Sequence, residues 1–234
     1  MKKVILSLLT VCLTVFSLTA QLTKGVVTME VTDATSDDQQ MAMQLGMLKG
    51  ATTTIYFSGD QSMTEMDIMG GMMKSRSYTN PSSNTMDMMI DAMGNKVWVS
   101  SPLEEAKALQ EKEGVANAKI TYDKSDTKEI MGYTAHKVNV TMPDMQAGMS
   151  ISGYVTTDIK TDATVINGAE GLKIDGFPLE FTIVTPQMSV TISTTDIKKT
   201  VDEAVFTPVT EGYQKMTLDE FTKNLGGMTG GLGF

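Results

Sequence analysis

The chain has 234 residues, enough for one large domain or two small ones. It contains 19 Lys and Arg against 28 Asp and Glu, and only 6% of its residues are aromatic. Nucleic acids and anionic membrane surfaces select basic proteins, and base stacking requires aromatic side chains. We therefore expect no nucleic-acid partner.

Residues 1–20 have the three parts of a secretory signal peptide. Met1-Lys2-Lys3 is basic, Val4 to Phe16 is almost wholly apolar, and the small residue Ala20 precedes Gln21. The apolar run of about 13 residues is shorter than the roughly 20 that a spanning helix needs, which makes an uncleaved anchor the weaker alternative. We predict an exported protein of the periplasm or cell envelope, or of the extracellular space, with no transmembrane segment in the mature chain.

Cleavage at this site would also remove Cys12, the single cysteine. Lipidation of Cys12 is not expected, because the bulky Val11 precedes it and it lies inside the apolar run. The mature chain then has one histidine, no cysteine and a net charge of −11, since only Lys2 and Lys3 are lost among its charged residues. It cannot form a disulfide, so its stability must come from a hydrophobic core.

Alternating apolar and polar residues after the signal peptide predict strands with one buried and one solvated face. The predicted strands are Val27–Val31, Thr52–Ser58, Glu65–Ile68, Met86–Asp91, Lys96–Ser100, Lys119–Tyr122, Thr127–Met131, His136–Met142, Ser150–Thr157, Phe177–Ile183 and Val190–Ile192. Turns are expected where glycine follows a short polar or methionine residue, as at Ser58-Gly59, Met93-Gly94 and Met131-Gly132.

Few helices are expected. Asp37–Leu48 and Pro102–Lys112 have helical patterns, and Thr217 with Glu220 forms a capping box ahead of a third helix. The predicted fold is mainly β (α+β), with a single curved antiparallel sheet, or half-barrel, and one to three helices packed against it. Residues 21–225 are expected to form this domain, and the glycine-rich residues 226–234 a disordered tail.

Several segments carry a family resemblance. They are Gly25–Glu30, Ile55–Asp60, Asp126–Lys137, Gly176–Phe181, and Phe206-Thr207-Pro208 ahead of Gly212-Tyr213. In this order they resemble a secreted family of Bacteroidota-type bacteria, a domain of unknown function (DUF4412-like). Its members look like the half-barrels of periplasmic lipoprotein carriers, which implies a curved sheet around an apolar hollow. The family often has a cysteine in the strand after the Gly-Tyr turn, where this chain has Ala135 and His136.

Methionine is the unusual component of the composition, with 21 in the chain. Twelve lie close together, at positions 41, 43, 47, 63, 66, 69, 72, 73, 86, 88, 89 and 93. Thioethers bind Cu(I), but they also fill irregular cores and line adaptable binding surfaces. If Met63, Met66, Met69 and Met72 lie on extended chain, they alternate between faces and are too far apart to share an ion. We therefore expect no tight Cu(I) site among these four residues.

The remaining residues indicate no enzyme. His136 has no second histidine for a metal site and is expected to be a hydrogen-bonded core or rim residue. Trp98 is expected to pack beside the polar face. No spacing singles out a catalytic carboxylate pair, so we expect no catalytic residues, metal site or cofactor.

The preferred function is that of a non-enzymatic envelope protein that binds an apolar or lipid-like ligand, or a partner segment of an envelope protein, in a methionine-lined hollow. Soft-metal (copper) binding and a purely structural role are the alternatives. The residues expected to line the hollow are Met66, Ile68, Met86, Met88, Ile90, Phe177, Leu179 and Phe181.

Overall fold

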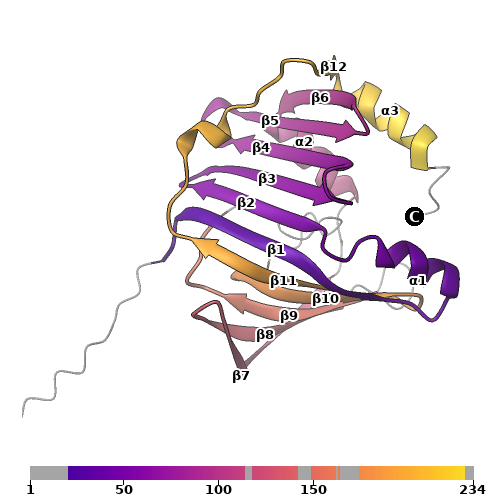
Figure 1. The fold of residues 1–234 in the computed structure, drawn as a ribbon. Coiled ribbons are helices and arrows are strands. Elements are labelled where there is room, and N and C mark those ends of the chain that lie inside the picture. The colour runs from indigo at the N-terminus through magenta and orange to yellow at the C-terminus, as the bar shows by residue number, and fades with distance from the viewer. Residues whose placement is uncertain (1–20, 114–117, 142–148, 162, 164–173, 230–234) are drawn as a thin grey trace, which may run out of the picture.

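A computed structural model describes residues 21–113, 118–141, 149–161, 163 and 174–229. Within these residues the protein is one open, curved sheet of 12 strands with three α-helices (Figure 1). The predicted fold class is confirmed. The predicted signal peptide and Cys12 lie outside the described residues.

The elements follow one another in the order in which they are numbered. The strands are β1 (Lys24–Thr35), β2 (Thr52–Ser58), β3 (Gln61–Ile68), β4 (Met73–Asn80), β5 (Thr85–Ala92), β6 (Asn95–Pro102), β7 (Lys119–Ile130), β8 (Tyr133–Thr141), β9 (Ser150–Thr156), β10 (Phe177–Val184), β11 (Ser189–Lys198) and β12 (Gln214–Met216). The helices are α1 (Gln39–Gly46), α2 (Leu103–Glu113) and α3 (Leu218–Thr229), with short 3-10 turns η1 (Pro81–Ser83) and η2 (Glu203–Phe206).

The strand order is β12-β6-β5-β4-β3-β2-β1-β11-β10-β9-β8-β7. Each of β2 to β6, and each of β7 to β11, pairs with its neighbours in sequence, and the two series join where β1 pairs with β11. All of these pairings are antiparallel, and β12 adds to β6 in parallel. The sheet therefore consists of two meanders joined at its centre.

Side chains alternate between two faces, which we call inner and outer. On the central strands the inner face carries Val27, Met29, Ile55 and Phe57, which are all buried. They belong to the main core, which also contains Val138, Val140, Ile151, Val155 and Phe181. The outer face of the same strands carries residues such as Thr28 and Thr54, which are only half-buried.

Each helix contacts a different part of the sheet: α1 contacts β1, α2 contacts β5 and β6, and α3 contacts β6. The Asp38 side chain caps α1 by accepting a 2.8 Å hydrogen bond from the Met41 backbone N–H, and Leu45 packs against Ala34 and Val190. Helix α2 follows β6, lies behind β4 and β5 in Figure 1, and buries Leu103 and Ala106. Among the described residues, no helix is both long enough and apolar enough to cross a membrane.

Helix α3 begins with the predicted capping box. Its two backbone N–H groups are satisfied reciprocally, because Thr217 N donates to Glu220 Oε2 at 2.9 Å and Glu220 N donates to Thr217 Oγ1 at 3.2 Å. The Glu220 carboxylate accepts from the Thr217 backbone N–H and, at 3.0 Å, from the Thr217 hydroxyl, and these two bonds lower the pKa of Glu220. The helix continues to Thr229, so it overlaps the first residues of the predicted tail at 226–234.

Residues 199–213, which we call the strap, connect β11 to β12 along the outer face. Val205, Phe206 and Tyr213 of the strap pack against a second core of Met63, Tyr78 and Met89. The strap is also held by Glu203, which accepts hydrogen bonds from Lys24 Nζ and, at 3.0 Å, from Ser58 Oγ. Both bonds lower the pKa of the exposed Glu203 carboxyl.

Three local predictions differ from the structure. β4 and the short β12 were not predicted. The two strands predicted at 119–122 and 127–131 form the single strand β7, with an irregularity in register between Asp123 and Thr127. Met69 and Met72, expected on extended chain, lie in the turn between β3 and β4.

Candidate functional site

The inner face of β3 and β5 carries five of the eight predicted lining residues. On β3, Met66 is opposite Ser75 of β4 and Ile68 is opposite Met73. On β5, at the other side of β4, Ile90 is opposite Ser75 and Met88 is opposite Ser77. The fifth residue is Met86, and all five are half-buried. The small serines of β4 thus lie between larger apolar side chains on both neighbouring strands.

The other three predicted residues have a different environment. Phe177, Leu179 and Phe181 are 4%, 0% and 3% exposed, and they pack in the main core with Ile151 and Val155. A register irregularity lies between Pro178 and Glu180, within this group. The eight predicted residues are therefore divided between a packed half of the sheet and a half that is only partly covered.

Helix α2 marks one border of the partly covered half. Val99 and Ser101 lie on the inner face of β6, in register with Met88 and Met86, and both are buried. Helix α2, which follows directly, contacts β5 and β6. The apolar strip of Met66, Ile68 and Ile90 lies farther along the strands, toward the turns at residues 69–72 and 93–94.

Two buried polar atoms on the inner face have no hydrogen-bond partner among the described residues. They are Nδ1 of His136, on the same face of β8 as Val138, and Oγ1 of Thr194, which pairs with Met29 across β1 and β11. His136 is half-buried, as predicted for a rim position, and Thr194 is 6% exposed. Buried polar groups are nearly always paired in folded proteins, so these two require an explanation.

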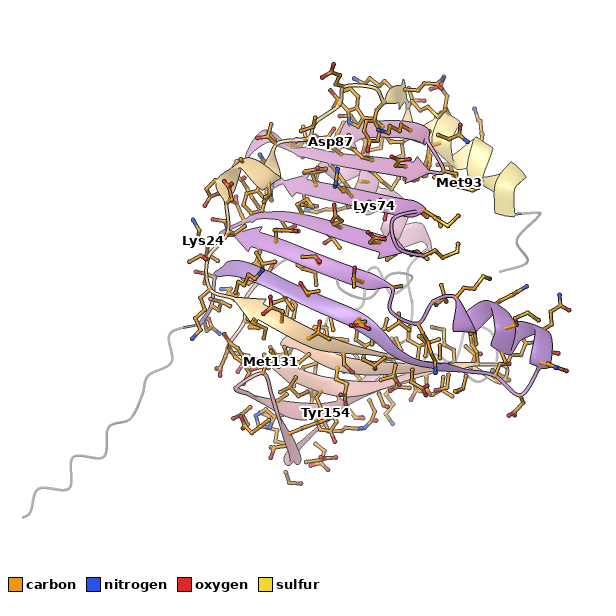
Figure 2. The ribbon with its side chains drawn as sticks, in the orientation of Figure 1. Lys24, Lys74, Asp87, Met93, Met131 and Tyr154 are labelled. Atoms are coloured by element: carbon orange, nitrogen blue, oxygen red, sulfur yellow. The ribbon has the colours of Figure 1, made fainter. Side chains whose placement is uncertain are left out.

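The outer face of the same strands is polar and internally paired (Figure 2). Lys74 contacts Asp67 at 2.9 Å, Lys96 contacts Asp91 at 3.7 Å, and Arg76 pairs with Glu65. Hydrogen bonding to Asp67 raises the pKa of Lys74. These pairs leave the outer face charged but nearly neutral, in contrast to the apolar inner face.

The single tryptophan lies on the outer face, beside this charged surface, as predicted. Trp98 Nε1 donates a 2.8 Å hydrogen bond to Asp87 Oδ1, and Lys215 Nζ lies 4.6 Å from the ring centroid. Under the strap, burial raises the pKa of both Tyr56 and Tyr78. These tyrosines remain protonated at neutral pH and act as packing residues.

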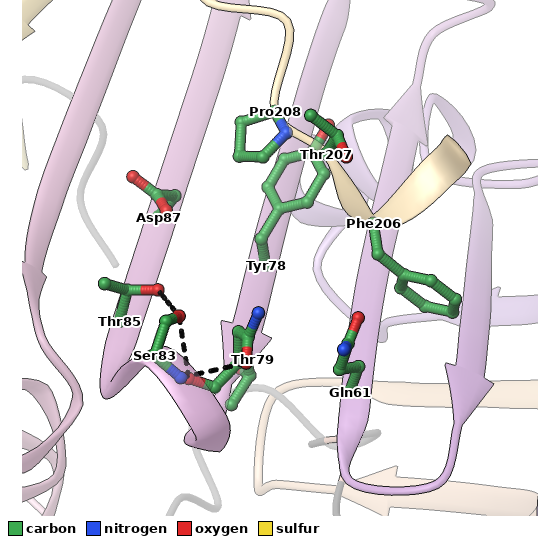
Figure 3. A pocket seen from close by; sticks show the side chains of 10 residues that line it. Gln61, Tyr78, Thr79, Ser83, Thr85, Asp87, Phe206, Thr207 and Pro208 are labelled. Carbon is green, nitrogen blue, oxygen red and sulfur yellow. Dashed lines mark hydrogen bonds between the residues drawn. The ribbon is translucent and has the colours of Figure 1, made fainter. Parts of the chain in front are cut away.

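A small pocket of about 250 Å³ opens between the strap and the β4–β5 hairpin (Figure 3). Its lining includes Phe206 and Pro208 of the strap and the polar residues Asn80, Ser83 and Thr85. Those polar groups bond to one another, since Ser83 N donates to Asn80 Oδ1 at 3.2 Å and the Ser83 and Thr85 hydroxyls are 2.7 Å apart. Its described lining residues include no cysteine, histidine or lysine.

A second pocket, of about 440 Å³, lies between the start of α1 and the β10–β11 turn, with Asp38, Gln44 and Gln187 among its lining residues. Within the described ranges, no group of three or more His, Cys, Asp or Glu residues is placed to hold a metal ion. Any metal bound by this part of the chain would need other donors.

Of the twelve clustered methionines, Met41 packs against Ala34, Leu45 and Val190, and the other eleven lie in four environments. Met63 and Met89 are buried on the outer face under the strap, whereas Met66, Met86 and Met88 are on the inner face. Met43 and Met47 are exposed at α1. The last group, Met69, Met72, Met73 and Met93, is exposed where two hairpins turn, and only the adjoining glycines indicated these turns in the sequence.

Comparison with known proteins adds no family. No family model matches the chain, so the DUF4412-like resemblance is not confirmed, and no curated protein matches it either. Three solved structures similar to it are the lipoprotein LppX from Mycobacterium tuberculosis, an uncharacterized conserved protein from Thermus thermophilus, and LprF from Mycobacterium bovis.

These likenesses are distant. The identities are 11%, 9% and 14%, and the TM-scores are 0.35, 0.36 and 0.32. The matches cover 77%, 84% and 76% of this chain and 89%, 91% and 88% of those proteins. At such TM-scores the backbones superpose too loosely to transfer a function to this chain.

Proposed function

We propose that this protein binds an apolar, lipid-like ligand against the inner face of its sheet and acts in the cell envelope. The observation that supports the proposal most is the half-buried strip of Met66, Ile68, Met86, Met88 and Ile90 on one face of β3 and β5. On the same face of β1 and β2, Val27, Met29, Ile55 and Phe57 are buried, so the apolar surface continues from a packed core into a region that is only partly covered.

The residue types suit a flexible apolar ligand. Methionine has three rotatable side-chain bonds and a polarizable sulfur, so it adapts to chains of different shape. Each ligand CH₂ transferred from water to such a surface contributes about 0.8 kcal/mol. An acidic protein surface is compatible with this role, because burial of an apolar chain does not require basic residues.

The inner face also holds two buried polar atoms, His136 Nδ1 and Thr194 Oγ1, that lack partners within the described part of the chain. They belong to β8 and β11, among the strands of the packed main core, and not to the strip on β3 and β5. They therefore do not discriminate between ligands with and without a polar end. A fatty acid or phospholipid is the preferred ligand class, because its acyl chains match the apolar strip.

The binding experiment is a titration with a fluorescent fatty-acid analogue, followed by displacement with phospholipid. Met88→Asp should weaken binding at least tenfold, because a carboxylate on an apolar contact surface has a large desolvation cost. Met131→Asp is the matched control, since Met131 is exposed in the β7–β8 turn, and it should bind like the wild type. Circular dichroism of both variants checks that they fold.

Absence of saturable binding, or equal binding by folded Met88→Asp and wild type, would refute the proposed ligand site. The envelope location is tested separately by fractionating the native cells and sequencing the N-terminus. Mature protein should begin at Gln21 and carry no acyl group. Full-length chain in the cytoplasm would refute export.

A further inference from the structure

The turns at residues 69–72 and 93–94, which we call the paired turns, bring several methionines onto adjacent stretches of backbone. The first joins β3 to β4 and the second joins β5 to β6, at the same end of the sheet. Met93 N donates a 2.9 Å hydrogen bond to Met72 O, so the two turns are in direct backbone contact. The expectation that Met69 and Met72 lie on extended chain is wrong, so the argument that extended chain keeps them too far apart to share an ion does not apply to this pair.

The thioethers of the paired turns are accessible. Met93, Met72 and Met69 are 80%, 53% and 42% exposed. In Figure 2, Met93 lies at the tip of its hairpin, beside the end of β3 and β4. Because a methionine side chain has three rotatable bonds, sulfur atoms on two bonded turns can converge without movement of the backbone.

Aspartate side chains hold the backbone of both turns through hydrogen bonds. Gly71 N donates to Asp67 Oδ1 at 2.5 Å, and Gly94 N donates to Asp91 Oδ1 at 3.1 Å. The same two carboxylates contact Lys74 and Lys96, so the base of the paired turns has balanced charge. The methionines are therefore held on an ordered support and not on loose chain.

Two of these methionines occupy a backbone conformation that favours other residues. Met69 has φ of 56° and Met93 has φ of 51°, where glycine or asparagine is the usual choice. The chain does use asparagine in this conformation, at Asn84 with φ of 51°. Stability alone therefore does not explain these exposed apolar side chains.

We propose that Met69, Met72 and Met93 form a binding site for Cu(I). Thioethers are soft, uncharged donors that select Cu(I) over Zn²⁺ and other harder cations. A monovalent ion needs no carboxylate ligand, which agrees with the balanced charge beneath the turns. Met73, at the start of β4, is the nearest additional thioether in the sequence and is also exposed.

Met131 provides an internal control for this site. It also precedes a glycine in a hairpin turn, has φ of 53°, and is 48% exposed. It lies at the other end of the sheet from Met93, on the hairpin of β7 and β8 (Figure 2). It therefore shares the conformation and exposure of Met93 but not its place beside Met72.

The test is an anaerobic competition titration of the mature protein against a chromophoric Cu(I) chelator. The wild type should withdraw one equivalent of Cu(I), and the triple variant M69L/M72L/M93L should bind at least tenfold more weakly. Met131→Leu should bind like the wild type. Leucine conserves the volume of these exposed side chains, so all variants should remain folded.

A second measurement locates the ion. With methyl-¹³C methionine, addition of Ag(I), a redox-stable soft ion, should shift the methyl resonances of Met69, Met72 and Met93 and leave that of Met131 in place. Failure to withdraw Cu(I), binding that survives in the triple variant, or shifts confined to other methionines would each overturn the proposal. The fatty-acid assay should be unchanged in the triple variant, so failure of either proposal can be distinguished.

Discussion

At the scale of single residues, three hairpin turns contain a methionine with positive φ: Met69, Met93 and Met131. A side chain with a Cβ atom strains the backbone there, whereas asparagine tolerates the conformation through local hydrogen bonds. The structure thus contains three positions where the amino acid is not the one that stability alone would select. Such positions are expected, because natural proteins are rarely at their stability optimum.

Met131→Asn should therefore stabilise the protein, by up to about 1 kcal/mol. Met93→Asn should give a similar gain in stability, because its turn has the same form. The two variants should differ in Cu(I) affinity, which Met93→Asn lowers and Met131→Asn leaves unchanged. Urea denaturation measures the first effect and the chelator titration the second. Loss of stability in both variants would contradict the strain assigned to these turns.

At the scale of elements, Gly153 shows how closely β9 approaches β10. A Cβ atom added at Gly153 would lie 2.3 Å from the carbonyl oxygen of Glu180 and 2.9 Å from Cβ of Phe181. Neither atom is the free end of a flexible side chain. Only glycine permits β9 to pair with β10 in the observed register, which in turn buries Phe181.

Gly153→Ala should destabilise the protein by about 1–3 kcal/mol, as is usual when an atom is forced into a packed region. Gly46→Ala is the control, because its added Cβ meets no atom within 4 Å. That change replaces a helical glycine and should be neutral or stabilising by up to about 1 kcal/mol. Chemical denaturation of both variants is the measurement. A Gly153→Ala protein as stable as the wild type would show that β9 and β10 can separate freely.

Strands could be predicted from the sequence where the inner face is apolar. β5 has Met86, Met88 and Ile90 on that face, and its alternation is plain. β4 escaped prediction because its inner face carries Ser75 and Ser77, so both of its faces are polar. Its polar side chains find their partners on the neighbouring strand β3, in the ion pairs of Lys74 with Asp67 and of Arg76 with Glu65. The sequence of one strand cannot predict such pairs between strands.

The candidate sites show the same limit. Alternation correctly indicated that Met66, Met86 and Met88 share a face with Ile68 and Ile90, because alternation is a property of each strand. The proximity of Met72 and Met93 depends on the register of β3, β4, β5 and β6 together. Local spacing carries no information about that register, and the extended-chain interpretation of residues 63–72 failed at the turn.

At the scale of the whole molecule, the two meanders differ from the pairing that joins them. β2 to β6 and β7 to β11 form from strands that follow one another in sequence, whereas Val27 of β1 pairs with Ile197 of β11. Closure of a long loop costs entropy before its contacts form, so distant pairings form late. In pulse-labelled hydrogen exchange during refolding, amides shared by β2 to β6 should become protected before those shared by β1 and β11. Simultaneous protection would contradict this order.

Because β11 lies between β1 and β10, both of these strands stay uncovered on one side until β11 has been synthesised. A chain that ended before β11 would have an uncovered edge on β1 and another on β10, each presenting unpaired N–H and C=O groups. Such edges invite pairing with other chains and recognition by proteases and chaperones. In the complete protein a single strand covers both, and the described sheet ends only at β12 and at β7, whose exposed side chains include Lys124, Asp126 and Glu129. We therefore expect a chain that ends before β11 to be bound by chaperones or degraded.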